Sequence, residues 1–287
     1  MTWGQAGLVW PMPGAEPVYP QASWARAFRE AGFTWVRMDV PVSRDRANAE
    51  TSVAVMRHAG LEVLPILSWP SAEPDVDALC GFAEWYVETF PDSQWVELGN
   101  EPWILDKVPG WEYLRCAGPM AKALEDAHPT VRVVLAMDLY DHVSGQERGW
   151  PGVDEVIACI ASSPRRWADL HPYRNPYRPT WSPWGSRDRE YEAIEQRLGH
   201  HRFVYGEMGW KPNEGERQAS GDFHVEELEI ATHHGIPLVA VYCHIADLVT
   251  PAWDFGLWVA DGSVVTPRPA AETVSAYLQA CAPQSSP

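Results

Sequence analysis

The stretch that decides the fold is Gln94–Trp103, with the sequence QWVELGNEPW. Its apolar and β-branched start predicts a short β-strand over Gln94–Gly99. A longer amphipathic segment with helical spacing, Trp111–Ala127, follows it. We therefore interpret this part of the chain as one strand–helix unit, whose strand ends in the polar pair Asn100 and Glu101.

The same unit recurs along the whole chain. Eight short apolar runs begin 27 to 37 residues apart, which is the period of strand–helix units and not of hairpins. The predicted strands are Ala6–Trp10, Thr34–Val40, Leu61–Leu67, Gln94–Gly99, Val131–Met137, Trp167–Leu170, Arg202–Gly206 and Pro237–Cys243. Eight units in about 250 residues predict a (β/α)₈ TIM barrel, and no linker divides residues 1–287, so we expect a single domain.

The helices that belong to these units are predicted from amphipathic spacing and from glycines that stop them. They cover Ser23–Ala31, Asn48–Ala59, Asp75–Thr89, Trp111–Ala127, Val153–Ala161, Ser186–Leu198, Phe223–His234 and Ala270–Ala282. A doubly wound open sheet is the alternative. It is disfavoured because Trp10–Pro13 stands where a glycine-rich phosphate turn would follow the first strand.

Composition excludes several classes of function. The chain has 22 Lys and Arg against 39 Asp and Glu, a formal net charge of −17, which argues against nucleic acid or an anionic membrane surface as the partner. We see neither a membrane-spanning apolar run nor a signal peptide. The five cysteines are scattered and form no CxxC pair. We expect a cytoplasmic protein, or a secreted one after removal of a leader, and make no prediction of oligomeric state.

Polar residues gather at the predicted strand ends. A barrel carries its active site at that face, so these residues together predict a polar pocket. They are Arg37 and Asp39, Ser68 and Trp69, Asn100 and Glu101, Asp138, His171 and Tyr173, Glu207 and Trp210, and His244 and Asp247. Glu101 ends the fourth strand and Glu207 the seventh, on opposite sides of the barrel. Paired carboxylates suit cleavage of a glycosidic bond.

The motifs carry a family resemblance. Leu98–Trp103, LGNEPW, resembles the Asn-Glu-Pro motif of the retaining (β/α)₈ glycoside hydrolases of clan A, which include cellulases, mannanases and β-xylosidases. Tyr205–Trp210, YGEMGW, is similar to the nucleophile strand of that superfamily. Arg37 and His171–Tyr173 also match. The segments DFGL (Asp254–Leu257), DG (Asp261–Gly262) and PRPA (Pro267–Ala270) resemble its closing segment.

The resemblance implies a role for each matching residue. Glu101 would be the acid/base and Glu207 the nucleophile; Asn100 would hold the 2-hydroxyl of the sugar. Arg37 and Tyr173 would hydrogen-bond the nucleophile, and His171 would line the pocket. Aromatic rings near the strand ends are candidates to stack on sugar, namely Trp69, Trp103, Trp210, Tyr242 and Trp253.

Two positions depart from the pattern of the superfamily. Its eighth strand commonly ends in a Trp that floors the catalytic subsite, whereas this chain has Val241–His244, VYCH. Trp253, Trp210 or Tyr242 are candidates to replace that Trp, and His244 to change which sugar fits. The third strand ends in Ser68 and Trp69 where the cellulase branch frequently has His, which weakens the case for that branch.

The chemistry of the pair agrees with these roles. Beside Arg37, Glu207 should be ionised, while Glu101, facing that carboxylate, should keep its proton. A retaining mechanism also requires carboxyl groups about 5 to 5.5 Å apart. We predict no cofactor and no metal: none of the three Lys lies inside a predicted strand for a Schiff base, and the His pairs fall at helix ends. A barrel that binds glycan without cleaving it is the alternative.

Overall fold

The computed structural model describes residues 6–9, 22–40, 42, 46–69, 74–137, 140–141, 146–147, 149–172, 186–210, 217–241, 257–261 and 264–281. Within these ranges, eight parallel strands close into a barrel in the order β1-β10-β9-β8-β5-β4-β3-β2. The predicted (β/α)₈ barrel is therefore confirmed. Its strands are β1 (Ala6–Val9), β2 (Trp35–Asp39), β3 (Glu62–Leu67), β4 (Trp95–Leu98), β5 (Arg132–Ala136), β8 (Arg166–Leu170), β9 (Phe203–Met208) and β10 (Val239–Val241).

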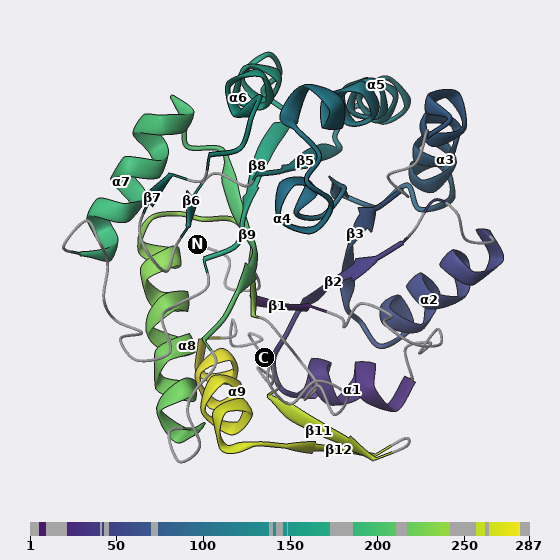
Figure 1. The fold of residues 1–287 in the computed structure, drawn as a ribbon. Coiled ribbons are helices and arrows are strands. Elements are labelled where there is room, and N and C mark those ends of the chain that lie inside the picture. Colours follow the sequence, from purple (N-terminus) through teal and green to yellow (C-terminus); the bar gives the residue numbers. More distant parts are fainter. Residues whose placement is uncertain are drawn as a thin grey trace.

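Helices surround the strands (Figure 1). All eight predicted helices are present, and the α4 turn lies between β4 and α5. The helices are α1 (Ala22–Glu30), α2 (Arg46–His58), α3 (Val76–Thr89), α4 (Pro102–Asp106), α5 (Gly110–Ala127), α6 (Val153–Ala161), α7 (Arg187–Leu198), α8 (Arg217–His233) and α9 (Pro269–Cys281). None of the described helices is both long and apolar enough to cross a membrane.

Helix α8 begins at Arg217, six residues before the predicted start at Phe223. The discrepancy arises at Gly221, a residue with poor helix propensity that discourages a helical prediction. In the structure it serves helix packing. A Cβ at Gly221 would come within 2.7 Å of Thr273 Cβ on α9, so only glycine allows the two helices to pack this closely.

Two short antiparallel pairs lie outside the barrel, and neither was predicted as strands. One is β6 (Tyr140–Asp141) with β7 (Gln146–Glu147), and the other is β11 (Trp258–Asp261) with β12 (Val264–Pro267). Trp258 of β11 packs against Phe28 of α1 and Phe33, with ring centroids 5.2 and 5.9 Å apart. Trp258 thus joins the β11–β12 pair to the hydrophobic core next to α1, and Figure 1 shows this pair beside α1.

The core has two layers. The larger lies between the strands and the helices, and the smaller fills the barrel interior around Trp35, Leu64, Trp95, Val134, Val204, Leu238 and Ala240. Because side chains alternate along a strand, Arg37 shares the interior face with Trp35, and Glu97 shares it with Trp95. Inside the barrel, the charged groups therefore lie next to the apolar layer, on its side nearer the carboxyl ends of the strands. An active site is expected at those ends.

Candidate active site

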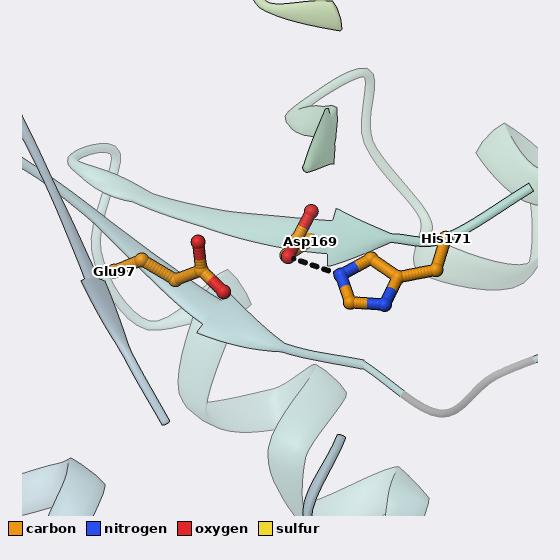
Figure 2. A group of neighbouring side chains, drawn as sticks. All are labelled: Glu97, Asp169 and His171. Atoms are coloured by element: carbon orange, nitrogen blue, oxygen red, sulfur yellow. Dashed lines mark hydrogen bonds and ion pairs between the residues drawn. The ribbon is translucent and has the colours of Figure 1, made fainter. Parts of the chain in front are cut away.

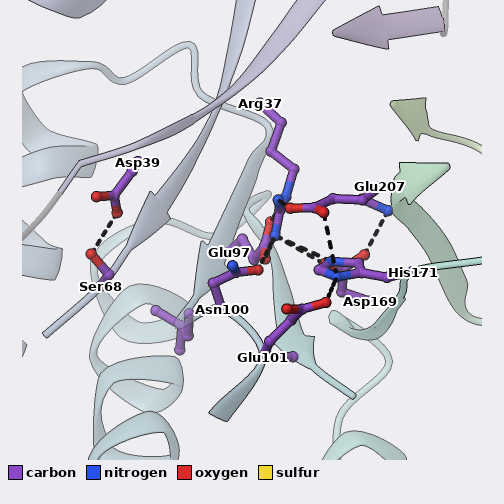
Figure 3. Close-up of polar contacts among 12 residues, drawn as sticks. Arg37, Asp39, Ser68, Glu97, Asn100, Glu101, Asp169, His171 and Glu207 are labelled. Atoms are coloured by element: carbon purple, nitrogen blue, oxygen red, sulfur yellow. Dashed lines mark hydrogen bonds and ion pairs between the residues drawn. The ribbon is translucent and has the colours of Figure 1, made fainter. Parts of the chain in front are cut away.

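Arg37 lies at the centre of the site. Its side chain is completely buried, and each donating nitrogen of its guanidinium is bound. Nε and Nη2 donate to the two oxygens of Glu97 at 2.6 and 2.5 Å, and Nη1 donates to Glu207 Oε1 at 2.6 Å. Nη2 also donates to Asn100 Oδ1 at 2.9 Å. The predicted contact between Arg37 and Glu207 is confirmed, and Figure 3 shows how the carboxylates surround the guanidinium.

His171 connects two further acids. Its Nδ1 lies 2.8 Å from Glu101 Oε1, and its Nε2 lies 2.9 Å from Asp169 Oδ2 (Figures 2 and 3). Burial alone would lower the pKa of His171, but the carboxylates of Glu207 and Asp169 and the hydrogen bonds raise this pKa well above its usual value. When the ring is protonated it donates to both acids, and one exchangeable proton then lies in the hydrogen bond between His171 and Glu101.

Glu101 has a strained backbone. Its φ is 41°, in the left-handed region, although it is not a glycine and stands directly before Pro102. A following proline disfavours helical backbone, and a non-glycine residue held in this region costs about 1 to 3 kcal/mol. This backbone conformation turns the chain sharply from β4 into α4, and the Glu101 side chain reaches His171.

An irregularity in β9 directs Glu207. Val239 pairs with Tyr205 and Val241 pairs with Met208, so three steps along β9 match two along β10. Regular alternation would place Glu207 on the same face as Phe203 and Tyr205, which pack in the outer core layer. The bulge changes that orientation, and Glu207 reaches Arg37 inside the barrel instead.

Gly206 makes room for Asp169 beside β9. The Gly206 N–H donates to Asp169 Oδ1 at 2.6 Å. A Cβ at this position would lie 2.3 Å from the same oxygen, so a larger residue would displace the carboxylate. Gly206 thereby holds Asp169, and through it His171, in place.

Glu97 and Asp169 are site residues that sequence reasoning did not assign. Both are buried, at 0 and 1% exposure. Burial raises the pKa of Glu97 to about 8, with Asp169 adding to the rise and Arg37 opposing it. Burial also acts to raise the pKa of Asp169, but His171 and Arg37 outweigh it and lower that pKa. The sequence signal that could have found them is their spacing along the strands. Glu97 precedes Glu101 by four residues and Asp169 precedes His171 by two, and even spacings place residues on the same face of a strand.

Two groups of these side chains have oxygen and nitrogen atoms close enough to hold a metal ion. One is Glu97, Asp169 and His171 (Figure 2), and the other is Glu101, His171 and Glu207. The Arg37 guanidinium lies against Glu97, Asp169 and Glu207, and the protonated His171 lies against Asp169 and Glu101. Both groups thus contain built-in cations, and a protonated imidazole nitrogen cannot bind a metal. The prediction of no metal stays a prediction.

Glu101 and Glu207 face the same space. One carboxylate oxygen of each lies within 4.8 Å of the other and of a nitrogen of His171. Both side chains are largely buried, at 16 and 8% exposure. The structure therefore brings together Arg37, Asn100, Glu101, His171 and Glu207, all five of them predicted from strand ends.

The predicted aromatic residues are spread out. Trp69 is half-buried and stacks on Tyr113, with ring centroids 6.0 Å apart and planes 13° apart. Trp103 is half-buried on α4, with Lys107 Nζ 5.7 Å from its ring. Trp210 is 3% exposed and packs against Phe223 in the core. Their roles in substrate binding stay predictions. The remaining predicted residues, Tyr173, Tyr242, His244, Trp253, Asp138 and Asp247, lie outside the described residues.

Comparison with known proteins finds similarity in structure. No family model matches the sequence, and no curated protein matches it. A Thermotoga maritima Cel5A in complex with cellobiose superimposes with a TM-score of 0.63 at 15% identity, over 96% of this chain and 97% of that one. An endo-β-1,4-mannanase from Thermotoga petrophila gives 0.65 at 12% identity, over 99% of this chain and 78% of that one.

A β-glucosidase from Pyrococcus furiosus gives a TM-score of 0.67 at 11% identity, over 98% of this chain and 96% of that one. Enzymes named for action on different β-linked sugars thus share this barrel over nearly its whole length. The resemblance to the (β/α)₈ glycoside hydrolases that the motifs predicted is therefore confirmed in the fold.

Proposed function

We propose that this protein is a retaining glycoside hydrolase that cleaves a β-glycosidic bond by double displacement. The observation that carries the proposal is the pair Glu101 and Glu207, whose oxygens approach within 4.8 Å of each other. Retaining enzymes place their two carboxyl groups about 5 to 5.5 Å apart, whereas inverting enzymes leave room for a water between them. The close spacing favours direct attack by one carboxylate.

Glu207 is the proposed nucleophile. Arg37 donates to its Oε1 at 2.6 Å, which stabilises the charged form and fixes the orientation of the carboxylate. In the first step an oxygen of Glu207 forms a bond to the anomeric carbon. The bond from that carbon to the leaving oxygen breaks, and its electron pair goes to the leaving oxygen. The guanidinium is positioned to accommodate the change in charge on Glu207 as the glycosyl-enzyme forms and breaks down.

Glu101 is the proposed acid and base. It delivers the proton that it shares with His171 to the leaving oxygen. In the second step Glu101 takes a proton from water, the water oxygen bonds to the anomeric carbon, and Glu207 departs as a carboxylate. Asp169 keeps His171 oriented through the Nε2 contact, so we assign Asp169 and Glu97 positioning roles.

Asn100 is placed to bind the sugar next to the reacting carbon. It precedes Glu101 in the chain, and its Oδ1 accepts from Arg37, which can only donate. Its amide Nδ2 is then the group left to donate, and we expect it to bind the oxygen on C2 of the sugar, which lies beside the anomeric carbon.

The test compares Glu101→Gln on two substrates that share one sugar. An aryl β-glycoside with a good leaving group needs little protonation, whereas an oligosaccharide needs it fully. We expect a loss of about 100-fold or more in turnover on the oligosaccharide and a much smaller loss of glycosylation on the aryl glycoside. Glu207→Gln should abolish both, and Glu192→Gln, an exposed acid on α7, should change neither.

An equal loss on both substrates in Glu101→Gln would remove the acid role. The configuration of the first-formed product, followed by proton NMR, tests retention separately. An initial α-anomer from a β-glycoside would indicate inversion and contradict the proposal. Binding of oligosaccharides without any turnover by the wild-type protein would instead favour the glycan-binding alternative.

A further inference from the structure

A cavity opens at Asn100, the residue before Glu101 in the chain. It has a volume of about 600 Å³ and lies between the carboxyl ends of β2, β3 and β4 and the helices α4 and α5. Asn100 is part of its wall, and the same residue accepts a hydrogen bond from Arg37 and precedes Glu101 in the chain. Pockets for small molecules generally have volumes of about 300 to 1,000 Å³. The size is therefore right for an additional group of the substrate.

The wall of this side cavity combines aromatic and polar groups. Trp69 and Tyr113, stacked on each other, supply ring surface. The Tyr113 hydroxyl is fully engaged, because it donates to Leu98 O and accepts from Ala136 N, so this residue offers only its ring. On the strand side the Ser68 hydroxyl donates to Asp39 Oδ1 at 2.5 Å (Figure 3). Rings beside fixed polar groups suit a sugar, which has apolar C–H faces and hydroxyl edges.

The charge of the wall narrows the ligand class. Its described carboxylates are Asp39, Asp106 and Glu112, and its described cation is Arg115. A uronic acid or a phosphorylated sugar would be repelled by this excess of negative charge. A neutral sugar can donate its hydroxyl protons to the same carboxylates.

The position of Asn100 tells where this sugar joins the substrate. Because Asn100 presents only its donor group, the oxygen on C2 needs only to accept a hydrogen bond. An ether oxygen accepts as a hydroxyl does, so a substituent on that oxygen keeps the contact. The side cavity lies beside Asn100 and has room for such a substituent.

We propose that the side cavity binds a second, neutral sugar attached to O2 of the sugar whose glycosidic bond is cleaved. The proposal rests on the proposed function, since it places the cleaved sugar between Glu101 and Glu207. It makes Ser68 and Asp39 specificity-determining residues for a 2-linked or 2-branched glycan, and it distinguishes this substrate from a linear 4-linked chain.

The experiment compares three nitrophenyl β-glycosides of one sugar series: the monosaccharide, its 2-O-linked disaccharide and its 4-O-linked disaccharide. We expect kcat/KM on the 2-linked compound to exceed both others by about 10-fold or more. Cys116→Phe, which fills the cavity from α5, should remove this preference and leave the monosaccharide rate within about 2-fold of wild type. Ser68→Ala adds no volume and should reduce the preference too, whereas Ser162→Ala, an exposed residue after α6, should not.

Turnover of the monosaccharide substrate tests the proposed function. The ratio of kcat/KM between the 2-linked disaccharide and the other two substrates tests the side cavity. Equal kcat/KM on all three substrates, or a preference that survives both Cys116→Phe and Ser68→Ala, would overturn the cavity proposal while leaving hydrolysis standing. If no substrate is hydrolysed, calorimetry with the 2-linked disaccharide decides. Binding that Ser68→Ala weakens supports the cavity without hydrolysis, and absence of binding refutes it.

Discussion

His224 makes the stability of this fold sensitive to acid. It lies completely buried on α8, where its Nδ1–H donates to Ser220 O at 2.6 Å and its Nε2 has no hydrogen-bond partner among the residues that the structure describes. Burial lowers its pKa from 6.5 to about 4, with the hydrogen bond to Ser220 opposing the shift. The folded protein therefore keeps this ring neutral over a range in which the unfolded chain binds a proton.

The sign and the size of the effect follow from proton linkage. Between these two pKa values the unfolded state binds more protons, so stability is complete above pH 6.5 and is lost as the pH falls towards 4. The difference between a pKa of 6.5 in the unfolded chain and about 4 in the folded protein corresponds to about 3 kcal/mol in full, of which about 2 kcal/mol is lost between about pH 7.5 and about pH 5.

The assay is urea unfolding of wild type and His224→Asn at both pH values. Asparagine keeps an amide donor near the position of Nδ1 but cannot take up the proton. We expect the free-energy difference between the two proteins to change by about 2 kcal/mol in favour of the variant on acidification. The control is His58→Asn, an exposed residue at the end of α2. The reasoning is refuted if His224→Asn loses as much stability on acidification as wild type does.

Three further predictions concern the site. Asp169→Asn removes a carboxylate that raises the pKa of His171, so the basic limb of the pH profile of kcat/KM should move to lower pH. The control is Asp106→Asn, in which this limb should stay in place. A basic limb that does not move in Asp169→Asn would contradict the positioning role of Asp169. Gly206→Ala should lower the free energy of unfolding by about 1 to 3 kcal/mol, because the Cβ of the alanine would lie 2.3 Å from Asp169 Oδ1. Urea unfolding that shows no loss of stability would refute this close packing. Tyr173→Phe should lower turnover with an unchanged circular dichroism spectrum, and an unchanged rate would remove its predicted contact with Glu207.

Local patterns predicted much of the fold. Each strand–helix unit has its own hydrophobic period and its own stop signal, so the eight strands and eight long helices could be placed from neighbouring residues alone. The short β11–β12 hairpin was missed, although its Asp261 and Gly262 were noted in a motif. Its pairing is stabilised through contacts such as Trp258 with Phe28, which are distant in sequence.

The sequence by itself determined which residues stand at the strand ends, and the fold rule for barrels then gathers Arg37, Asn100, Glu101, His171 and Glu207 on one face. Only the tertiary structure decided how these side chains are aimed. The β9 bulge depends on pairing with β10, and it orients Glu207 against the alternation that the strand alone implies.

Tertiary structure also decided which buried acids serve the site. Strand spacing relates Glu97 and Asp169 to Glu101 and His171, but it does not show that they serve the site, because a charged residue inside a strand becomes meaningful only when a distant cation meets it. Arg37 lies 60 residues from Glu97 along the chain and yet is bound to both of its oxygens. Periodicity is a property of neighbouring residues and can be read from the chain, whereas charge pairing and side-chain direction depend on strands that meet only when the barrel closes.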